Sequence, residues 1–275
     1  MAAGWDLLAS TDWLAASLDG AGRDFVLIDA GEAVAYRRAH IPGAVGVPHP
    51  YLKARDDRGH VMPPAEFEEL AASLGVSNDT PIVIYDDNAS LHAARVWWAF
   101  DYYGHRDLRV IDGGFNAWLD EGRPLTSLVP RPERGRYTAQ PDSTAVCALD
   151  ELKSAVEGGQ APQIWDVRSA PEWTGAELRG NQRGGHVPGA KHLEWRGLMQ
   201  GPPARRFRPR EEIEAMLRGA GIDPAAPTVT YCELGIRAAF GAFVLRLLGN
   251  EAASNYDGSM NEWANRPDTP LTTDS

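Results

Sequence analysis

Thr228-Val-Thr-Tyr-Cys-Glu-Leu-Gly-Ile-Arg237 is a stretch whose β-branched and aromatic residues predict a short strand, followed by a turn and an apolar helix over 238–248. A loop between a strand and a helix aims backbone N–H groups inward, and the helix dipole adds partial positive charge, so this loop favours an anion. With Arg237 at its end, the same field should favour the thiolate of Cys232, which is the nucleophilic form. The stretch therefore predicts a reactive cysteine, and the alternative is a buried cysteine that ends a core strand.

Length and charge limit the kinds of protein this chain can be. Its 275 residues exceed the ~100–200 residues of an average domain, so two domains are expected. The 27 Lys and Arg residues against 38 Asp and Glu give a formal net charge of −11. Such a charge offers no general attraction to nucleic acid or to an anionic membrane, and neither is an expected partner. Any anion must be bound by a local site.

The two cysteines, Cys147 and Cys232, are too few for a disulfide framework. Neither belongs to a C-x-x-C motif or to a Cys/His metal-binding spacing, so we expect no metal and no cofactor. Cys147 has no glycine or arginine around it and is expected to be inert. The first residues lack a basic segment followed by an apolar one, and no apolar run reaches the ~18 residues of a membrane span. A reducing cytoplasm is the expected location.

The chain contains an internal duplication. Segments 26–29, 40–44, 83–85 and 111–118 of the first half have counterparts at 163–168, 186–190, 229–231 and 256–263 of the second half. The offset between halves is 145 or 146 residues for three of these pairs and 137 for the first strand. So long a period indicates a duplicated domain, because stacked repeats have periods of ~20–50 residues.

Strands alternating with helices over both halves predict an α/β fold with a mostly parallel central sheet and helices on both faces of it. We place the first domain at 1–125, an extended proline-containing linker at 126–143 and the second domain at 144–275. The first helix is expected over 5–19. Ligands of parallel sheets bind at the carboxyl ends of the strands, which is where Cys232 falls.

Several motifs, in order and at the duplicated spacing, resemble those of tandem-domain rhodanese-type sulfurtransferases over nearly the whole chain. They are H-I-P-G-A at 40–44, H-V-P-G-A at 186–190, Y-D-D at 85–87, A-A-R-V-W-W at 93–98, V-I-D-G-G-F-N-A-W at 110–118 and Y-C-E-L-G-I-R at 231–237. The resemblance implies a catalytic second domain and an inactive first domain. Asp86 stands in the first half where Cys232 stands in the second, and a carboxylate cannot attack sulfur in this way.

The resemblance also implies a reaction. The family's thiolate takes a sulfane sulfur from thiosulfate or 3-mercaptopyruvate, holds it as a persulfide and passes it to cyanide, a thiol or a thioredoxin-like protein. Carried over to this chain, Cys232 is the nucleophile, and the loop residues Glu233, Leu234, Gly235, Ile236 and Arg237 supply backbone N–H groups and a guanidinium for the donor. Arg179 and Arg183 are expected to reach the donor from the opposite wall, and the alternative for both is a solvated basic loop.

The loop differs from those of the specialised family members. Glu233 and Leu234 match neither the C-G-S-G-V-T loop of mercaptopyruvate enzymes nor the C-R-K-G-V-T loop of thiosulfate enzymes. We expect the permanent charge of Arg237 to outweigh Glu233, whose side chain is predicted to turn to solvent, where water and salt screen it. Thiosulfate is therefore the predicted donor, with 3-mercaptopyruvate as the alternative.

Two other classes of function stay open at this stage. Cysteine-dependent phosphatases and arsenate reductases also use a cysteine, a loop of amides and an arginine, but their loop has five residues between the two, and residues 233–236 are four. The other class is a persulfide carrier or a binding module without turnover. Asp166 and His186 are interpreted as structural, because a histidine in a Pro-Gly turn more often forms a local hydrogen bond than acts as a base.

Overall fold

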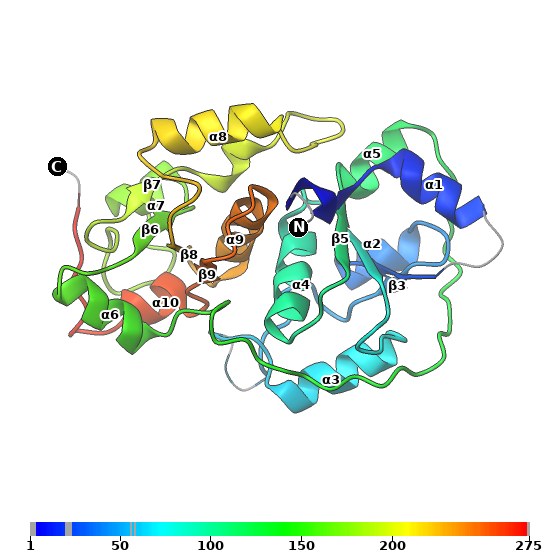
Figure 1. The fold of residues 1–275 in the computed structure, drawn as a ribbon, viewed down its shortest axis with the longest axis horizontal. Helices are drawn as coiled ribbons and strands as arrows, with labels where there is room; N and C mark the ends of the chain where they lie inside the picture. Colours follow the sequence, from blue (N-terminus) through cyan, green and yellow to red (C-terminus); the bar gives the residue numbers. More distant parts are fainter. Residues whose placement is uncertain (1–3, 20–23, 56, 58, 274–275) are drawn as a thin grey trace.

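The structure, a computed structural model, describes residues 4–19, 24–55, 57 and 59–273, and these form two α/β domains (Figure 1). The first sheet has strands β1 (Leu8–Ala9), β2 (Val26–Asp29), β3 (Val45–Gly46), β4 (Ile82–Tyr85) and β5 (Leu108–Ile111) in the order β1-β5-β4-β2-β3. The second has β6 (Gln163–Asp166), β7 (Lys191–His192), β8 (Thr228–Tyr231) and β9 (Ala253–Asn255) in the order β7-β6-β8-β9. All strand pairs within both sheets are parallel, as predicted.

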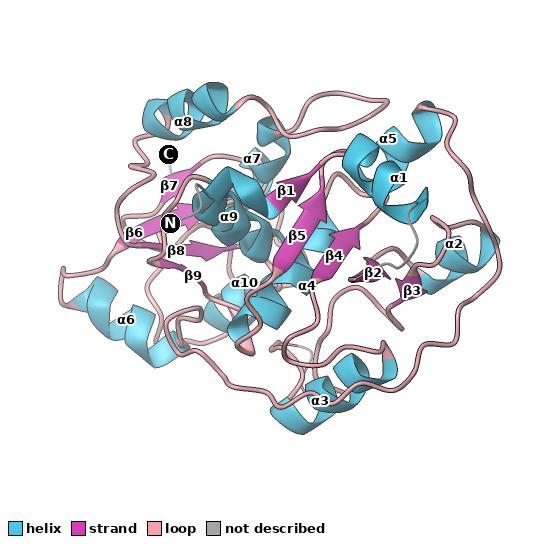
Figure 2. Ribbon diagram, turned by 45° about the vertical axis from the view of Figure 1, so that its right-hand side comes forward, coloured by secondary structure: helices cyan, strands magenta, loops and turns pink. Residues whose placement is uncertain are grey.

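Helices lie on both faces of each sheet (Figure 2). The first domain contains η1 (Gly4–Leu7), α1 (Thr11–Asp19), α2 (Ala33–Arg38), α3 (Pro64–Ser73), α4 (Leu91–Tyr102) and α5 (Gly114–Asp120). The second contains α6 (Leu149–Glu157), α7 (Ala170–Thr174), η2 (Trp195–Leu198), α8 (Arg210–Gly219), α9 (Ile236–Leu247) and α10 (Ser259–Trp263).

Alternation along the strands sends side chains into separate cores on the two faces of a sheet. In β2, Leu27 packs with the core under α1 and α5, whereas Ile28 packs with the core under α3 and α4. In β6, Ile164 faces α6 and α10, and Trp165 faces α8 and α9. β2 (Val-Leu-Ile-Asp) and β4 (Ile-Val-Ile-Tyr) are almost wholly apolar and buried, which is why the sequence predicted these two strands.

The two domains are joined through α4 and α9, which lie side by side at the centre of the molecule (Figure 1). Both helices are apolar nearly all round, and the rings of Trp97 and Phe243 pack edge to face with centroids 4.9 Å apart. The α4 and α9 side chains belong to one continuous core that includes both sheets. This arrangement places the start of α9, and with it Cys232, next to first-domain residues.

Residues 126–143 form no helix or strand, and they pack along the first domain beside α3. The Gly135 N–H donates to the carbonyl of Ala72 at 2.9 Å, and Tyr137 is 7 % exposed among aromatic rings of the first domain. These contacts hold the segment against the first domain, so it does not act as a free spacer.

The prediction of one helix over 5–19 is wrong. The chain forms η1, then the short strand β1, and only then α1 from Thr11. Leu8 and Ala9 pair with Val110 and Ile111 at the edge of the first sheet, so sheet pairing overrides the helical pattern there. The side chain of Trp5 lies outside the described residues.

Candidate active site

The loop that carries Cys232 is tied to the segment that follows β9. The backbone N–H groups of Cys232 and Gly235 both donate to the hydroxyl of Ser259, at 3.0 and 3.1 Å. The Cys232 carbonyl accepts the N–H of Met260 at 3.1 Å, and the Gly235 carbonyl accepts the amide Nδ2 of Asn255 at 3.1 Å. Cys232 itself is 1 % exposed. The loop geometry therefore depends on residues 255–260 as well as on its own sequence.

Gly235 is required by this geometry. Its φ of +74° lies in the left-handed region, and it directly precedes α9. A Cβ at this position would lie 2.0 Å from Oδ1 of Asp257 and 2.6 Å from the Asp257 carbonyl oxygen. Only glycine lets the loop approach Asp257 so closely.

Several amides of the loop are free to bind an anion. Among the described residues, the backbone N–H groups of 233, 234 and 236–238 have no acceptor within hydrogen-bond distance. Four of the five lie at the start of α9 or within two residues of it, where the helix dipole adds partial positive charge. The first domain shows what such a loop can hold.

In the first domain, Asp86 occupies the corresponding position, and its carboxylate fills its own loop. Its two oxygens accept the backbone N–H groups of Asn88, Ser90, His92 and Ala93 at 2.7–2.9 Å. Burial raises the pKa of Asp86, and these amides, with His92, oppose that rise. The duplicated loop is therefore an anion cradle, and the cradle of the first domain is satisfied by its own side chain.

We expect Asp86→Ala to destabilise the protein while leaving turnover nearly unchanged. The substitution removes the acceptor of four buried N–H groups, and each such loss costs about 1–3 kcal/mol, so a decrease of at least about 3 kcal/mol in unfolding free energy is expected. The neighbouring Asp87 is exposed, and Asp87→Ala is the matched control. Urea unfolding of the two variants measures the difference. Equal stability of both would contradict the role given to the Asp86 carboxylate.

Arg237 does not present its guanidinium fork to a ligand, which corrects the expectation from the sequence. Its two terminal nitrogens each donate to one carboxylate oxygen of Glu172, both at 2.7 Å. Burial alone would raise the pKa of Glu172, but hydrogen bonds from Arg237 and Ser169 and the charge of Arg237 lower it to about 2. Burial alone would lower the pKa of Arg237, but its hydrogen bonds to Glu172 and its proximity to Cys232 raise that pKa. The positive charge of Arg237 beside Cys232 is therefore partly neutralised by the carboxylate of Glu172.

The prediction that the Glu233 side chain turns to solvent is wrong. It is half-buried, and both carboxylate oxygens accept the amide Nδ2 of Asn181, at 2.9 and 3.0 Å. Burial raises the pKa of Glu233, and the Asn181 hydrogen bond opposes the rise. The hydrogen bonds from Asn181 thus hold the Glu233 carboxyl group at the edge of the loop.

The two arginines predicted on the opposite wall lie in different settings. Arg179 is 50 % exposed, with Nε 3.8 Å from Oε1 of Glu172 and Nη1 3.3 Å from Oε1 of Glu177. Arg183 donates instead to backbone carbonyls of the segment 263–269 and to the hydroxyl of Thr269. Arg179 therefore stays near the site, whereas Arg183 fastens the C-terminal segment and is not retained in the proposed donor site.

Asp166 and His186 form bonds within the fold, in agreement with their structural interpretation. Asp166 pairs with Arg168 at 2.6 Å and accepts the hydroxyl of Tyr231 at 2.6 Å. His186 contacts the carbonyl of Trp173 through Nδ1 at 3.1 Å and stacks on the Trp173 ring. Neither side chain needs a substrate to complete its contacts.

The thiol of Cys147 lies in a setting that makes it a poor nucleophile. It is 6 % exposed, and burial, followed by the charge of Glu151, raises its pKa to about 12. A thiol with so high a pKa is almost entirely protonated at neutral pH. This agrees with the expectation that Cys147 is inert.

A buried charge cluster next to the loop was missed by the sequence analysis. Asp257 is 1 % exposed, and its Oδ1 lies 3.0 Å from Nζ of Lys53 and 2.6 Å from Nη1 of Arg95. Its Oδ2 accepts the N–H of Val61 at 2.6 Å. Burial alone would raise the pKa of Asp257, but Arg95 and Lys53 lower it. The sequence feature that could have indicated this cluster is Arg95, a charged residue within the otherwise apolar helix α4.

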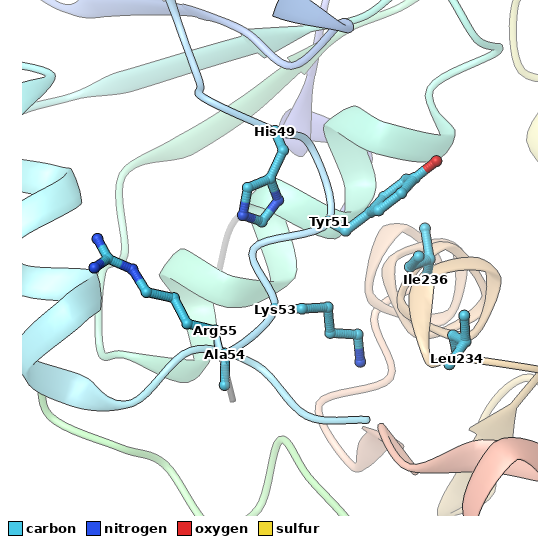
Figure 3. A pocket seen from close by; sticks show the side chains of 7 residues that line it. All are labelled: His49, Tyr51, Lys53, Ala54, Arg55, Leu234 and Ile236. Carbon is cyan, nitrogen blue, oxygen red and sulfur yellow. The ribbon is translucent and has the colours of Figure 1, made fainter. Parts of the chain in front are cut away.

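A cavity of about 520 Å³ lies between the domains beside the loop that carries Cys232 (Figure 3). The first domain lines it with His49, Tyr51, Lys53 and Arg55, and the second with Leu234 and Ile236. Its volume is in the range of small-molecule sites.

The described residues contain no group of three or more His, Cys, Asp or Glu side chains placed to hold a metal ion. Every helix among these residues is too short or too polar to span a membrane.

Comparisons with known proteins match the chain along nearly its whole length. The family described as "Rhodanese-like domain" matches residues 10–121 and 148–266. A thiosulfate sulfurtransferase of Corynebacterium glutamicum is 33 % identical over 280 residues, covering 97 % of this chain and 90 % of that protein. The sulfur carrier protein TtuD of Thermus thermophilus is 35 % identical over 284 residues, covering 97 % and 96 %.

Among solved structures, an anaerobic ergothioneine biosynthesis enzyme from Chlorobium limicola superimposes with a TM-score of 0.85 at 24 % identity. The match covers 98 % of this chain and 71 % of that one. At this identity the likeness concerns the fold.

Proposed function

The chain belongs to the rhodanese-like domain family, and from this premise we propose that it is a sulfurtransferase that works through a persulfide on Cys232. The Cys232 thiolate attacks the outer sulfur of thiosulfate, a new S–S bond forms on Sγ, and sulfite leaves with the electron pair of the broken S–S bond. Cyanide or a thiolate then attacks the outer sulfur of the persulfide. That sulfur leaves as thiocyanate or as a new persulfide, and the Cys232 thiolate is regenerated.

The observation that carries this proposal is the set of unpaired loop amides around a single buried cysteine. A persulfide anion needs preorganised donors, and the amides of 233, 234 and 236–238 have no acceptor among the described residues. The first domain supports this interpretation, because its equivalent loop binds the carboxylate of Asp86 through four such amides. Arg237 and Glu172 hold the start of α9 in place beside Cys232.

We propose thiosulfate as the preferred donor, with 3-mercaptopyruvate as the alternative. Thiosulfate carries two negative charges and mercaptopyruvate one at neutral pH, so a site with excess positive charge gains more from thiosulfate. The name of the Corynebacterium glutamicum relative supports the same choice. The cationic wall of the cavity, which contains Lys53, supplies that charge in place of Arg237.

The test compares both donors with cyanide as the common acceptor and thiocyanate formation as the readout. We expect a kcat/KM for thiosulfate several times that for 3-mercaptopyruvate, and the preference should shrink at high salt because screening weakens the charge term. A mercaptopyruvate rate that exceeds the thiosulfate rate would overturn the choice of donor while leaving the persulfide mechanism intact.

A second candidate is a persulfide carrier that delivers its sulfur to another protein. The likeness to the sulfur carrier protein TtuD favours it. The two functions differ in stoichiometry. An enzyme releases many thiocyanate molecules per chain with excess thiosulfate and cyanide, whereas a carrier restricted to a protein acceptor releases at most one.

A further inference from the structure

The cations that the second domain places around the catalytic loop are already engaged. Both terminal nitrogens of Arg237 bind Glu172, and Arg168 binds Asp166 and the carbonyl of Gly185. Arg179 contacts two carboxylates, with Nη1 3.3 Å from Glu177 and Nε 3.8 Å from Glu172. An anionic donor that approaches Cys232 therefore needs a positive charge from elsewhere. The first domain is the neighbour that can supply it.

Lys53 of the first domain reaches this site. Figure 3 shows its side chain extending toward the part of the cavity formed by Leu234 and Ile236. The residue is 8 % exposed, and Nζ donates to the carbonyl of Gly59 at 2.7 Å and to Oδ1 of Asp257 at 3.0 Å. An ammonium has three N–H donors, so one remains without an acceptor in the described part of the chain.

The three charged side chains that contact one another here, Lys53, Arg95 and Asp257, do not cancel in charge. Lys53 and Arg95 contribute two positive charges, and Asp257, which lies between them, contributes one negative charge. All three side chains are buried, so water and salt screen the remaining positive charge only weakly. This contact cluster carries one positive charge in excess, which a Cys232 thiolate and Asp57 partly offset from outside it. The Lys53 N–H without an acceptor is therefore the group that favours an anion in the cavity.

We propose that Lys53 binds the anionic end of the sulfur donor in the cavity between the domains, so that the first domain selects the donor by its charge. This inference rests on the proposed function. It assigns the cavity to a small sulfur compound whose leaving group is an oxyanion, such as thiosulfate. The apolar side chains of Leu234 and Ile236 border the same cavity and lie within the catalytic loop, so a donor held by Lys53 is directed toward Cys232.

The ionisation of Lys53 gives this role a pH signature. Burial, and then repulsion by Arg95, lowers the pKa of Lys53 to about 8, while Asp257 and the proximity of Cys232 oppose that fall. Asp57 of the same segment also faces it. Lys53 is therefore charged below about pH 8 and loses its charge above it. The KM for thiosulfate should rise between pH 7 and pH 9.

The experiment uses the full chain and compares Lys53→Met with Lys53→Arg. We expect Lys53→Met to raise the KM for thiosulfate at least about tenfold, because a desolvated, charge-assisted hydrogen bond is lost. A neutral organic trisulfide reacts differently, because attack by the Cys232 thiolate on its central sulfur gives a mixed trisulfide on Cys232 and releases one organic thiolate. The apparent KM of this step, measured by thiolate release, should stay within about twofold of the original, because no charge is bound there. Lys53→Arg should restore the affinity and remove the rise in KM above pH 8. The matched control is Lys153→Met, since Lys153 also pairs with an aspartate, Asp268, at 2.8 Å.

The outcomes separate this inference from the proposed function. An unchanged thiosulfate KM in Lys53→Met, or an equal increase for thiosulfate and the neutral trisulfide, would overturn the role of Lys53. If the unaltered protein takes up sulfur from neither donor, the proposed function itself fails. Should Lys53→Met not fold, the pH dependence of Lys53→Arg decides, and a KM that still rises above pH 8 in that variant would contradict the inference.

Discussion

Cys232→Ser is expected to reduce thiocyanate formation to the uncatalysed rate while the protein stays folded. The serine hydroxyl is similar in size to the thiol, but it is a far poorer nucleophile at neutral pH and cannot hold a transferable sulfur in this way. The two loop amides that donate to Ser259 are backbone groups of 232 and 235, so the substitution leaves them in place. Stability should change little.

Steady-state assays and thermal unfolding of Cys232→Ser measure these two effects. Cys147→Ser is the matched control, because it makes the same change at the other buried cysteine of the chain. Loss of turnover in Cys147→Ser with retention in Cys232→Ser would reverse the assignment of the nucleophile.

Gly235→Ala is expected to have the second largest effect, on both stability and turnover. Alanine at a φ of +74° costs about 1–2 kcal/mol, and the added Cβ would overlap Oδ1 and the carbonyl oxygen of Asp257. Asp257 cannot move away easily, because Lys53 and Arg95 hold its carboxylate. Overpacking of this kind adds roughly 1–3 kcal/mol, so a total loss of about 3 kcal/mol or more is expected.

Turnover of Gly235→Ala should fall further than its stability suggests, because the loop amides move with the backbone. A displacement of about 1 Å in a catalytic group can reduce the rate on the order of 100-fold. Gly249→Ala is the matched control, since Gly249 has a φ of +92° and follows α9 at its other end, with no atom within 4 Å of the added Cβ. It should lose only about 1 kcal/mol and keep its activity. Equal behaviour of the two variants would show that the approach to Asp257 is unimportant.

The sequence predicted the parts of the site that are local along the chain. The strand before Cys232, the turn at Gly235 and the helix after it are encoded within ten neighbouring residues, and the structure has β8 and α9 there. The order of elements was also predictable, because both halves carry the same apolar strands and turn residues. Among the predicted helices, the one over 5–19 failed, because two residues of an edge strand pair across the sheet there.

The partners of the charged side chains could not be predicted, because they come from distant segments. Lys53 and Asp257 are 204 positions apart, and Glu172 and Arg237 are 65 apart. No periodic pattern links such residues. The packing of α4 on α9 brings Arg95 to the second domain, and Arg95 in turn binds the carbonyl of Tyr51, two residues before Lys53. For this reason the sequence assigned donor binding to Arg237, whereas the structure pairs that arginine with Glu172.

The most direct test of the account is the intact mass of the protein after treatment with thiosulfate and removal of excess donor. We predict that the unaltered chain and Cys147→Ser each gain the mass of one sulfur atom, that Cys232→Ser gains none, and that cyanide removes the added sulfur. A gain that persists in Cys232→Ser, or no gain in the unaltered chain with any sulfane-sulfur donor, would contradict the claim that Cys232 carries the persulfide.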